Sequence, residues 1–217
     1  MPAAPIFVEP PARLPAGPVH IWRLVAEEID VLSDDEQARA DKFRSETARA
    51  AYVIGRSGIR RAAAIYTGTA ARDLVILHSP SGKPYFANAA IHFNLSHSGG
   101  IVVAAFSGSP VGIDIESLGR CRDFAGIADR FFHTSEAEGI RRSPNEDEFL
   151  RLWTGKEAML KLSEEGLSGG LAEARPEADG TGTLRGQKIR LTAFSFDRIV
   201  GAVASFQPAE VKGWFQT

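Results

Sequence analysis

Residues 110–116 read PVGIDIE, and they are the most informative stretch of the chain. Apolar and other residues alternate here, which is the period-two pattern of a β-strand with two different faces. Asp114 and Glu116 then project together from one face, and the hydrophobic side chains point to the other. The ordinary interpretation is a strand with one buried and one solvated face. The alternative is a divalent-metal site, because Mg²⁺ prefers one or two carboxylates completed by water and substrate phosphate.

A second segment, residues 149–161, carries apolar side chains at helical spacing. This pattern predicts a helix with one face packed on the core. Glu157 lies four residues after Trp153 and four before Lys161, so an acid and a base border the apolar stripe. Such a pair is commonly a surface ion pair that contributes only about 0.2–0.5 kcal/mol. The helix by itself therefore does not identify a site.

Two shorter segments carry groups suited to an anion. Lys83 lies between a glycine and a proline, and Ser96 and His97 fall at the end of an expected strand. A hydroxyl, an imidazole and an ammonium are all donors that a phosphate accepts. A serine nucleophile would need a base brought to it in space, whereas adjacent strand residues point to opposite faces. The pattern favours phosphate binding over nucleophilic catalysis, with a turn histidine bonded to backbone as the ordinary alternative.

The helix before these strands carries three arginines, Arg49, Arg56 and Arg60, whose spacings of seven and four place them near one face. Most such runs are solvated surface. They would bear on function only if that face looked toward Lys83 and His97.

The whole pattern predicts an α+β protein of two similar halves, each a small antiparallel sheet packed with a long helix. Short sequence echoes between the halves, at nearly equal offsets, indicate a duplication. We expect a proline-rich arm at residues 1–18, an N-terminal half at residues 19–109, and a C-terminal half at residues 110–217 that carries the acidic residues. Residues 164–186 are expected to form an irregular excursion.

The expected helices and strands follow from periodicity and turn residues. Helical character is expected over Asp34–Tyr66, broken near Ser45, and over Asp123–Ile140 and Asp147–Leu162. Strands are expected at Val19–Leu24, Leu74–Leu77, Ile91–Leu95, Ile101–Phe106, Val111–Glu116, Lys188–Phe196 and Ile199–Phe206.

Composition excludes several classes of function. Lys and Arg total 25 against 27 Asp and Glu, so the chain lacks the basic excess of a non-specific nucleic-acid binder. Its one cysteine cannot form an internal disulfide, which favours a reducing compartment. No apolar run approaches a membrane span, and prolines crowd the N-terminus where a signal peptide would need an apolar run. We expect a cytoplasmic protein with neither nucleic acid nor membrane as a partner.

Taken together and in order, these segments resemble the 4′-phosphopantetheinyl transferases, in particular the larger, monomeric, Sfp-type subgroup. The motifs that carry the resemblance are Gly82-Lys83-Pro84, Phe93-Asn94-Leu95-Ser96-His97-Ser98, Val111–Glu116, Phe131-Phe132 with Glu136, and Trp153-x-x-Lys156-Glu157-Ala158-x-x-Lys161. The resemblance implies two pseudo-symmetric halves with coenzyme A in the cleft between them. It also implies transfer of 4′-phosphopantetheine to a serine of an apo acyl- or peptidyl-carrier protein, with release of 3′,5′-ADP.

The resemblance assigns roles to individual residues. It implies that Asp114, Glu116 and Glu157 hold Mg²⁺, with Mn²⁺ as an alternative. We expect Glu157 to be the general base, directly or through a metal-bound water, with Glu136 as the runner-up. The implied coenzyme A ligands are Lys83, Ser96 and His97 at the nucleotide end, Lys156 and Lys161 at the pyrophosphate, and Arg49 and Arg56 as further phosphate contacts. Lys161 also counts among the catalytic residues, because its charge would offset that of the leaving group.

Two other functions stay open at this point. The chain could be a coenzyme A or carrier-protein binding module that has lost its chemistry, or a metal-dependent hydrolase of phosphate esters. The presence of all three acids and both lysines favours the transferase. Two halves in one chain favour a monomer, and the sequence leaves open whether the carrier serves fatty-acid, polyketide or peptide synthesis.

Overall fold

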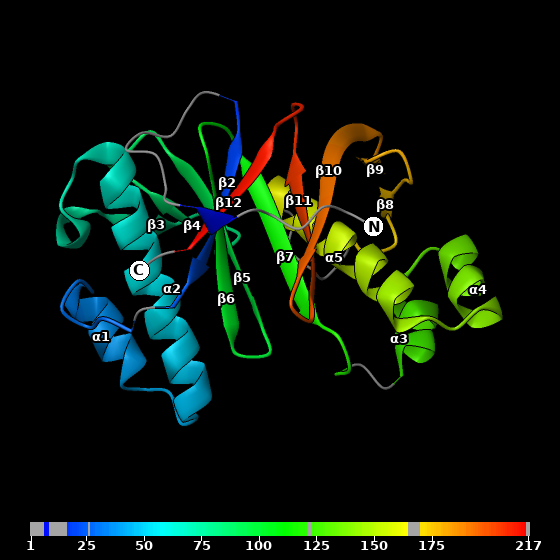
Figure 1. Ribbon diagram of the computed structural model, residues 1–217, viewed down its shortest axis with the longest axis horizontal. Helices are drawn as coiled ribbons and strands as arrows, with labels where there is room; N and C mark the ends of the chain where they lie inside the picture. Colours follow the sequence, from blue (N-terminus) through cyan, green and yellow to red (C-terminus); the bar gives the residue numbers. More distant parts are fainter. Residues whose placement is uncertain (1–6, 9–16, 26, 121–122, 165–169, 216–217) are drawn as a thin grey trace. The chain divides into compact units, whose positions relative to one another are not determined.

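The computed structural model describes residues 7–8, 17–25, 27–120, 123–164 and 170–215. These residues form two compact units, which we call the first unit (Pro5–Ser109 with Ala209–Thr217) and the second unit (Pro110–Pro208). Figure 1 shows strands and helices in both units, which confirms the predicted α+β class. The pseudo-symmetry of the halves and a shared cleft stay predictions.

The first unit is built on a five-stranded mixed sheet with the strand order β1-β12-β2-β6-β5. β2, β6 and β5 are antiparallel neighbours, but β12 runs parallel to β2, and β1 runs parallel to β12. The prediction of a purely antiparallel sheet is therefore wrong here. The strands are Phe7–Val8 (β1), Val19–Leu24 (β2), His92–Ser98 (β5), Ile101–Ser107 (β6) and Val211–Phe215 (β12).

The C-terminal segment is expected in the second half of the molecule, yet β12 adds to the sheet of the first unit. Its pairing with β2 joins residues nearly two hundred positions apart, such as Val211 and Val19. No local pattern encodes a partner at that distance. The first unit also contains a separate antiparallel pair, Ile76–His78 (β3) with Pro84–Phe86 (β4), after a short 3₁₀ turn at Ala71–Asp73.

Two helices complete the first unit, α1 (Asp34–Ala40) and α2 (Glu46–Thr67). The predicted break near Ser45 is confirmed, because the Ser45 hydroxyl caps α2 by accepting a hydrogen bond from the Ala48 amide at 3.3 Å. The helix ends at Gly68, whose φ of 70° suits glycine better than other residues. Buried side chains of α2 pack against β5 and β6 in one apolar core.

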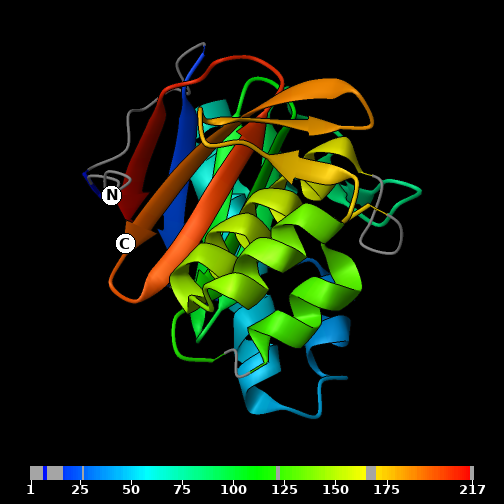
Figure 2. The ribbon, with the colours of Figure 1, turned by 90° about the vertical axis from the view of Figure 1, so that its right-hand side faces the viewer.

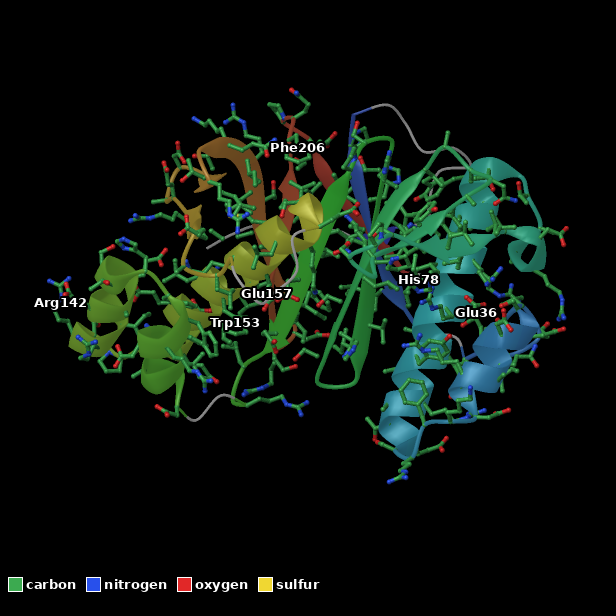
Figure 3. All side chains as sticks on the ribbon, turned by 180° about the vertical axis from the view of Figure 1, so that it is seen from behind. Glu36, His78, Arg142, Trp153, Glu157 and Phe206 are labelled. Carbon is green, nitrogen blue, oxygen red and sulfur yellow. The ribbon has the colours of Figure 1, made fainter. Side chains whose placement is uncertain are left out.

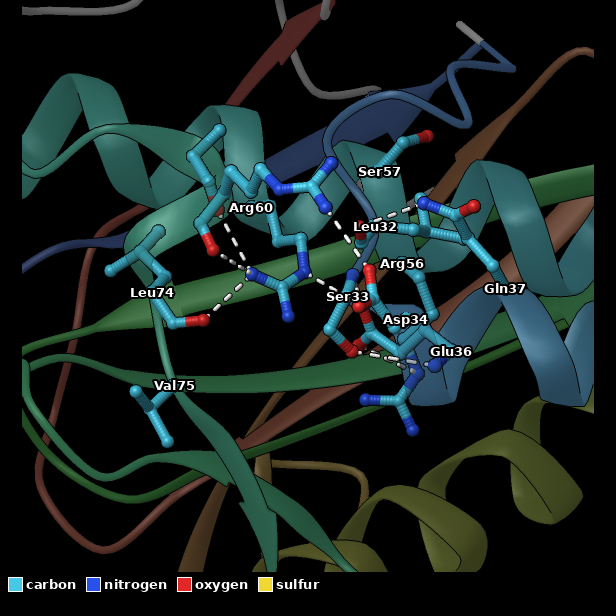
Figure 4. Close-up of polar contacts among 12 residues, drawn as sticks. Leu32, Ser33, Asp34, Glu36, Gln37, Arg56, Ser57, Arg60, Leu74 and Val75 are labelled. Carbon is cyan, nitrogen blue, oxygen red and sulfur yellow. Dashed lines mark hydrogen bonds and ion pairs between the residues drawn. The ribbon is translucent and has the colours of Figure 1, made fainter.

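Glu36 and Arg60 join α1 to α2 (Figure 4). Glu36 closes the capping box of α1 with Ser33 and also accepts a hydrogen bond from Arg60 Nε at 2.8 Å. Arg60 Nη1 donates to the carbonyls of Ala71 at 2.9 Å and Leu74 at 2.6 Å. A buried charge satisfied in this way holds the helix in one position. Arg60 is therefore a structural residue.

The second unit is built on an antiparallel sheet with the strand order β7-β11-β10-β9-β8. The prediction of an irregular segment over residues 164–186 is wrong for residues 174–184, because two strands lie there. Residues 165–169 fall outside the described residues. The strands are Val111–Ser117 (β7), Ala174–Pro176 (β8), Thr181–Leu184 (β9), Gln187–Phe196 (β10) and Ile199–Ser205 (β11).

Three helices belong to this unit: α3 (Phe124–Phe131), α4 (Thr134–Arg142) and α5 (Glu146–Ser163). The helical character expected over Asp123–Ile140 is confirmed, and it is divided between α3 and α4. Phe132 has extended backbone, and His133 then caps α4 in a capping box with Glu136. Figure 2 shows α5 lying across the sheet of β7, β11 and β10.

Candidate active site

The backbone of α5 packs closely on β7 at Gly112. A Cβ atom at this position would lie 2.0 Å from the Ala158 carbonyl oxygen and 2.7 Å from the Leu162 nitrogen. Only a residue without a side chain lets the helix backbone approach the strand this closely. This contact sets the position of the helix relative to Asp114 and Glu116, which share one face of the strand.

The predicted acidic residues come together at this contact. Asp114 and Glu157 are buried, with 5% and 6% of their surface exposed, and Glu116 is partly buried. Lys161, one turn beyond Glu157 on α5, places its Nζ 2.7 Å from Asp114 Oδ1. Figure 3 shows Glu157 on α5, with Trp153 one turn earlier. Three carboxylates therefore share a largely buried site with the ammonium of Lys161.

This crowding changes the ionisation of Glu157. Burial, followed by the negative charge of Asp114, raises the pKa of Glu157 to about 7, and Glu116 acts in the same direction. The positive charge of Lys161 opposes the shift. A carboxyl whose pKa lies near neutrality can both accept and release a proton at neutral pH. Of the predicted catalytic groups, Glu157 is thus suited to general base chemistry.

We expect Glu157→Gln to stabilise the metal-free protein at high pH. The folded pKa of about 7 exceeds the ordinary value of 4.5, so the folded state holds this proton more tightly than the unfolded state, and its stability falls as pH rises between those values. Glutamine does not titrate, so the variant avoids this loss. Above pH 7 its free energy of unfolding should exceed that of the wild type by up to about 3 kcal/mol. Urea unfolding with a chelator, from pH 4 to 8.5, measures the difference between the two proteins. A difference that does not vary with pH would contradict the raised pKa.

Among the described residues, no group of three or more His, Cys, Asp or Glu side chains is already arranged to hold a metal ion. The chemistry of the donors nevertheless fits Mg²⁺ or Mn²⁺, because carboxylate oxygens are the ligands that hard cations prefer. Burial raises the pKa of Glu157 most, and the negative charges of Asp114 and Glu116 add to it. A divalent cation would relieve this repulsion.

Lys156 lies in a different environment from Lys161. It is fully buried, and its Nζ donates to the carbonyls of Leu171 at 3.0 Å and Ala174 at 2.5 Å and pairs with Glu136 Oε2 at 2.7 Å. Burial lowers the pKa of Lys156, and Glu136 opposes that shift. A phosphate contact, as the resemblance implies, would require this ammonium to leave three acceptors. As it lies, Lys156 is a structural residue.

The same pair limits what Glu136 can do. Its Oε2 accepts a hydrogen bond from the His133 amide at 3.0 Å in addition to the ion pair with Lys156. These two contacts already occupy the Glu136 carboxylate and hold it beside Lys156. Glu157 is therefore a stronger candidate for the base than Glu136.

We expect Lys156→Met to lower the free energy of unfolding by about 3 kcal/mol, because it leaves the Glu136 carboxylate and two backbone carbonyls without their donor. Lys188→Met is the matched control, since Lys188 is exposed on β10. Equal stability of the two variants in urea unfolding would show that Lys156 has no structural role.

The first unit holds a cavity of about 250 Å³ that contains three of the predicted phosphate ligands, Arg56, Ser96 and His97. Arg56 Nη2 lies 3.0 Å from His78 Nε2, while its Nη1 is buried without a hydrogen-bond partner among the described residues. Such an N–H group would gain a partner if an anion entered the cavity. Arg56 thus faces the same cavity as His97, which meets the condition set for the arginine face with respect to His97 but not to Lys83.

The other predicted ligands of this unit do not line that cavity. Arg49 pairs instead with Glu27 at 3.4 Å. Lys83 follows a turn at Gly82, where φ is 87°, and lies partly exposed before β4. Sequence reasoning missed Tyr52, which lines the cavity under the Arg56 guanidinium at 5.6 Å from its ring centroid. The spacing of four residues between Tyr52 and Arg56 was a signal for this contact.

A second cavity, of about 280 Å³, lies in the second unit beside Glu116. Arg120 contributes a positive charge to it, and Phe149 and Trp153 supply much of its apolar wall. A largely apolar cavity next to the acidic residues suits an uncharged part of a ligand.

Comparisons with known proteins identify the family of this chain. Residues 21–109 match the family described as 4′-phosphopantetheinyl transferase, N-terminal, and residues 110–204 match the 4′-phosphopantetheinyl transferase superfamily. The 4′-phosphopantetheinyl transferase HetI of Nostoc sp. is 33% identical over 175 residues, which cover 73% of this chain and 74% of HetI. The corresponding protein psf-1 of Bacillus pumilus is 36% identical over 160 residues, covering 71% and 68% of the two chains.

The chain therefore belongs to the 4′-phosphopantetheinyl transferase superfamily and is an enzyme of that class. Similarity extends to Sfp of Bacillus subtilis strain 168, at 37% identity over 91 residues, or 40% of each chain. In the part of the chain that the structure describes, no helix is long and apolar enough to cross a membrane.

Proposed function

We propose that this enzyme transfers 4′-phosphopantetheine from coenzyme A to a serine of an apo acyl- or peptidyl-carrier protein. The serine oxygen attacks the β-phosphorus of coenzyme A, the bond from that phosphorus to the bridging oxygen breaks, and 3′,5′-ADP leaves. The observation that carries the proposal is the cluster of Asp114, Glu116 and Glu157 with Lys161, built by the packing of α5 on β7.

Glu157 takes the serine proton in this proposal. In the metal-free protein the pKa of Glu157 is about 7, and a bound cation would lower it, so that the carboxylate would be ionised and able to accept the proton directly or through a water. Lys161 carries positive charge next to Asp114 and is partly exposed, so it can approach the phosphates and offset the charge that grows on the leaving oxygen. The serine loses its proton as the new oxygen–phosphorus bond forms, and the electron pair of the broken bond stays on 3′,5′-ADP.

Asp114, Glu116 and Glu157 would hold Mg²⁺, or Mn²⁺ in its place. The bound cation would supply charge neutralisation for the pyrophosphate. The nucleotide end of coenzyme A, with its 3′-phosphate, is assigned to Lys83, Ser96 and His97, with Arg56 and Arg49 as further phosphate contacts. Arg56 Nη1, which is buried and has no hydrogen-bond partner among the residues that the structure describes, supports this assignment for the cavity of the first unit.

One experiment separates the proposal from its alternatives. The purified protein is incubated with coenzyme A, Mg²⁺ and a panel of apo-carrier proteins, and the carriers are weighed by mass spectrometry. A gain of one phosphopantetheine on a carrier supports transfer. Release of 3′,5′-ADP without carrier modification would support the hydrolase. If neither product formed, the result would support a binding module. The panel also identifies whether the carrier serves fatty-acid, polyketide or nonribosomal peptide synthesis.

We also propose that the enzyme works as a cytoplasmic monomer, because a single chain carries all the proposed ligands. Light scattering at working concentration tests the monomer, and fractionation of the source cells tests the compartment.

A further inference from the structure

The ion pair between Lys161 and Asp114 has a second consequence, which rests on the proposed function. Asp114 Oδ1, the oxygen that Lys161 Nζ approaches to 2.7 Å, belongs to a carboxylate proposed to hold the metal. The pair is asymmetric in its burial, because 7% of the Asp114 side chain is exposed against 28% of the Lys161 side chain. The acid is thus fixed in the interior, while the lysine has a route to solvent.

The single positive charge of Lys161 is smaller than the combined negative charge of the three carboxylates. Asp114, Glu116 and Glu157 bring three carboxylates together, and Lys161 is the cation that acts on Glu157 within the cluster. A divalent cation neutralises such a group better than a monovalent one, because attraction scales with charge. The two cations would compete, since they use the same carboxylate and repel each other at short range.

We propose that Lys161 is an internal counterion that takes the place of the divalent cation beside Asp114 in the metal-free enzyme. The arriving metal displaces its ammonium, which then swings into contact with the phosphates of coenzyme A. Lys161 is attached to α5 by a long flexible chain, so this movement needs rotation about side-chain bonds and no shift of the helix. Metal and coenzyme A therefore bind with positive coupling, and Lys161 carries that coupling.

The test measures metal affinity and needs no turnover. Mn²⁺ is titrated into the metal-free, full-length protein, and free Mn²⁺ is followed by electron paramagnetic resonance. We expect Lys161→Met to bind Mn²⁺ about tenfold more tightly than the wild type, because no ammonium has to leave Asp114. Lys188→Met is the matched control, because it makes the same change of charge at an exposed residue of β10. The charge of Lys188 acts on Asp179. The Mn²⁺ affinity of Lys188→Met should therefore equal that of the wild type.

If Lys161→Met binds Mn²⁺ no more tightly than the wild type, the inference is overturned. If this variant does not fold, Lys161→Arg decides, since a guanidinium can pair with a carboxylate through two hydrogen bonds and should weaken Mn²⁺ binding. Unchanged or tighter binding to Lys161→Arg would then overturn it. A wild-type enzyme that modifies a carrier but binds no Mn²⁺ would also overturn this inference, while leaving the transfer reaction in place.

The coupling is measured separately, by calorimetric titration of coenzyme A with and without Mn²⁺. We expect Mn²⁺ to tighten coenzyme A binding to the wild type by a larger factor than to Lys161→Met. An equal factor for both proteins would show that the displaced ammonium does not reach the phosphates.

Discussion

Asp114→Asn is expected to lower the rate of phosphopantetheine transfer by about a thousandfold, which corresponds to ~4 kcal/mol in the barrier. Asparagine keeps the size of the side chain but removes its charge. The proposed site then loses both a metal ligand and the carboxylate that pairs with Lys161 at 2.7 Å. The effect should appear mainly in kcat/KM, together with a higher Mg²⁺ concentration for half-maximal rate.

The fold should survive this change, because asparagine fills the same volume and Lys161 is already partly exposed. Asp179→Asn is the matched control in the same unit, since Asp179 is an exposed residue that accepts hydrogen bonds from Thr181. Turnover of Asp114→Asn near that of the wild type, with unchanged Mg²⁺ dependence, would defeat the assignment of the acidic residues.

Gly112→Ala is expected to have the largest effect on stability, a loss of about 5 kcal/mol in the free energy of unfolding. The added Cβ would lie 2.0 Å from the carbonyl oxygen of Ala158, a backbone atom held within α5. No side chain can rotate to relieve this contact, so the helix must move away from β7. The movement would also separate Glu157 and Lys161 from Asp114, and transfer should fall even where the protein is folded.

Gly139→Ala serves as the control for this substitution. Gly139 lies in α4, and a methyl group added to it would meet open space, because no described atom outside the neighbouring helix backbone lies within 4 Å of its Cβ position. Alanine there should stabilise the helix by roughly 0.5–1 kcal/mol. Urea unfolding of both variants measures the contrast. If Gly112→Ala unfolded at the same urea concentration as Gly139→Ala, the packing of α5 on β7 would be looser than the structure shows.

Helices and strands that are specified by residues close together in the sequence can be predicted well. The alternation over residues 111–116, the helix ending near Leu162 and the break at Ser45 depend on side-chain period and on capping groups within a few residues. The motifs also identify the family, which the comparisons show. Pairings between distant strands cannot be predicted in this way, because β12 finds its partner across almost the whole chain and β9 lies in a segment without a clear period.

The sequence by itself determined the α+β class, the family and the set of acids and bases near the site. Only the tertiary structure decided what each group does there. Lys156 and Lys161 lie on one helix, about 140° apart around its axis, and no local pattern says which of them meets Glu136 and which meets Asp114. Their difference arises from the elements that pack on each side of α5, because burial and charge partners are properties of contacts between segments far apart in the chain.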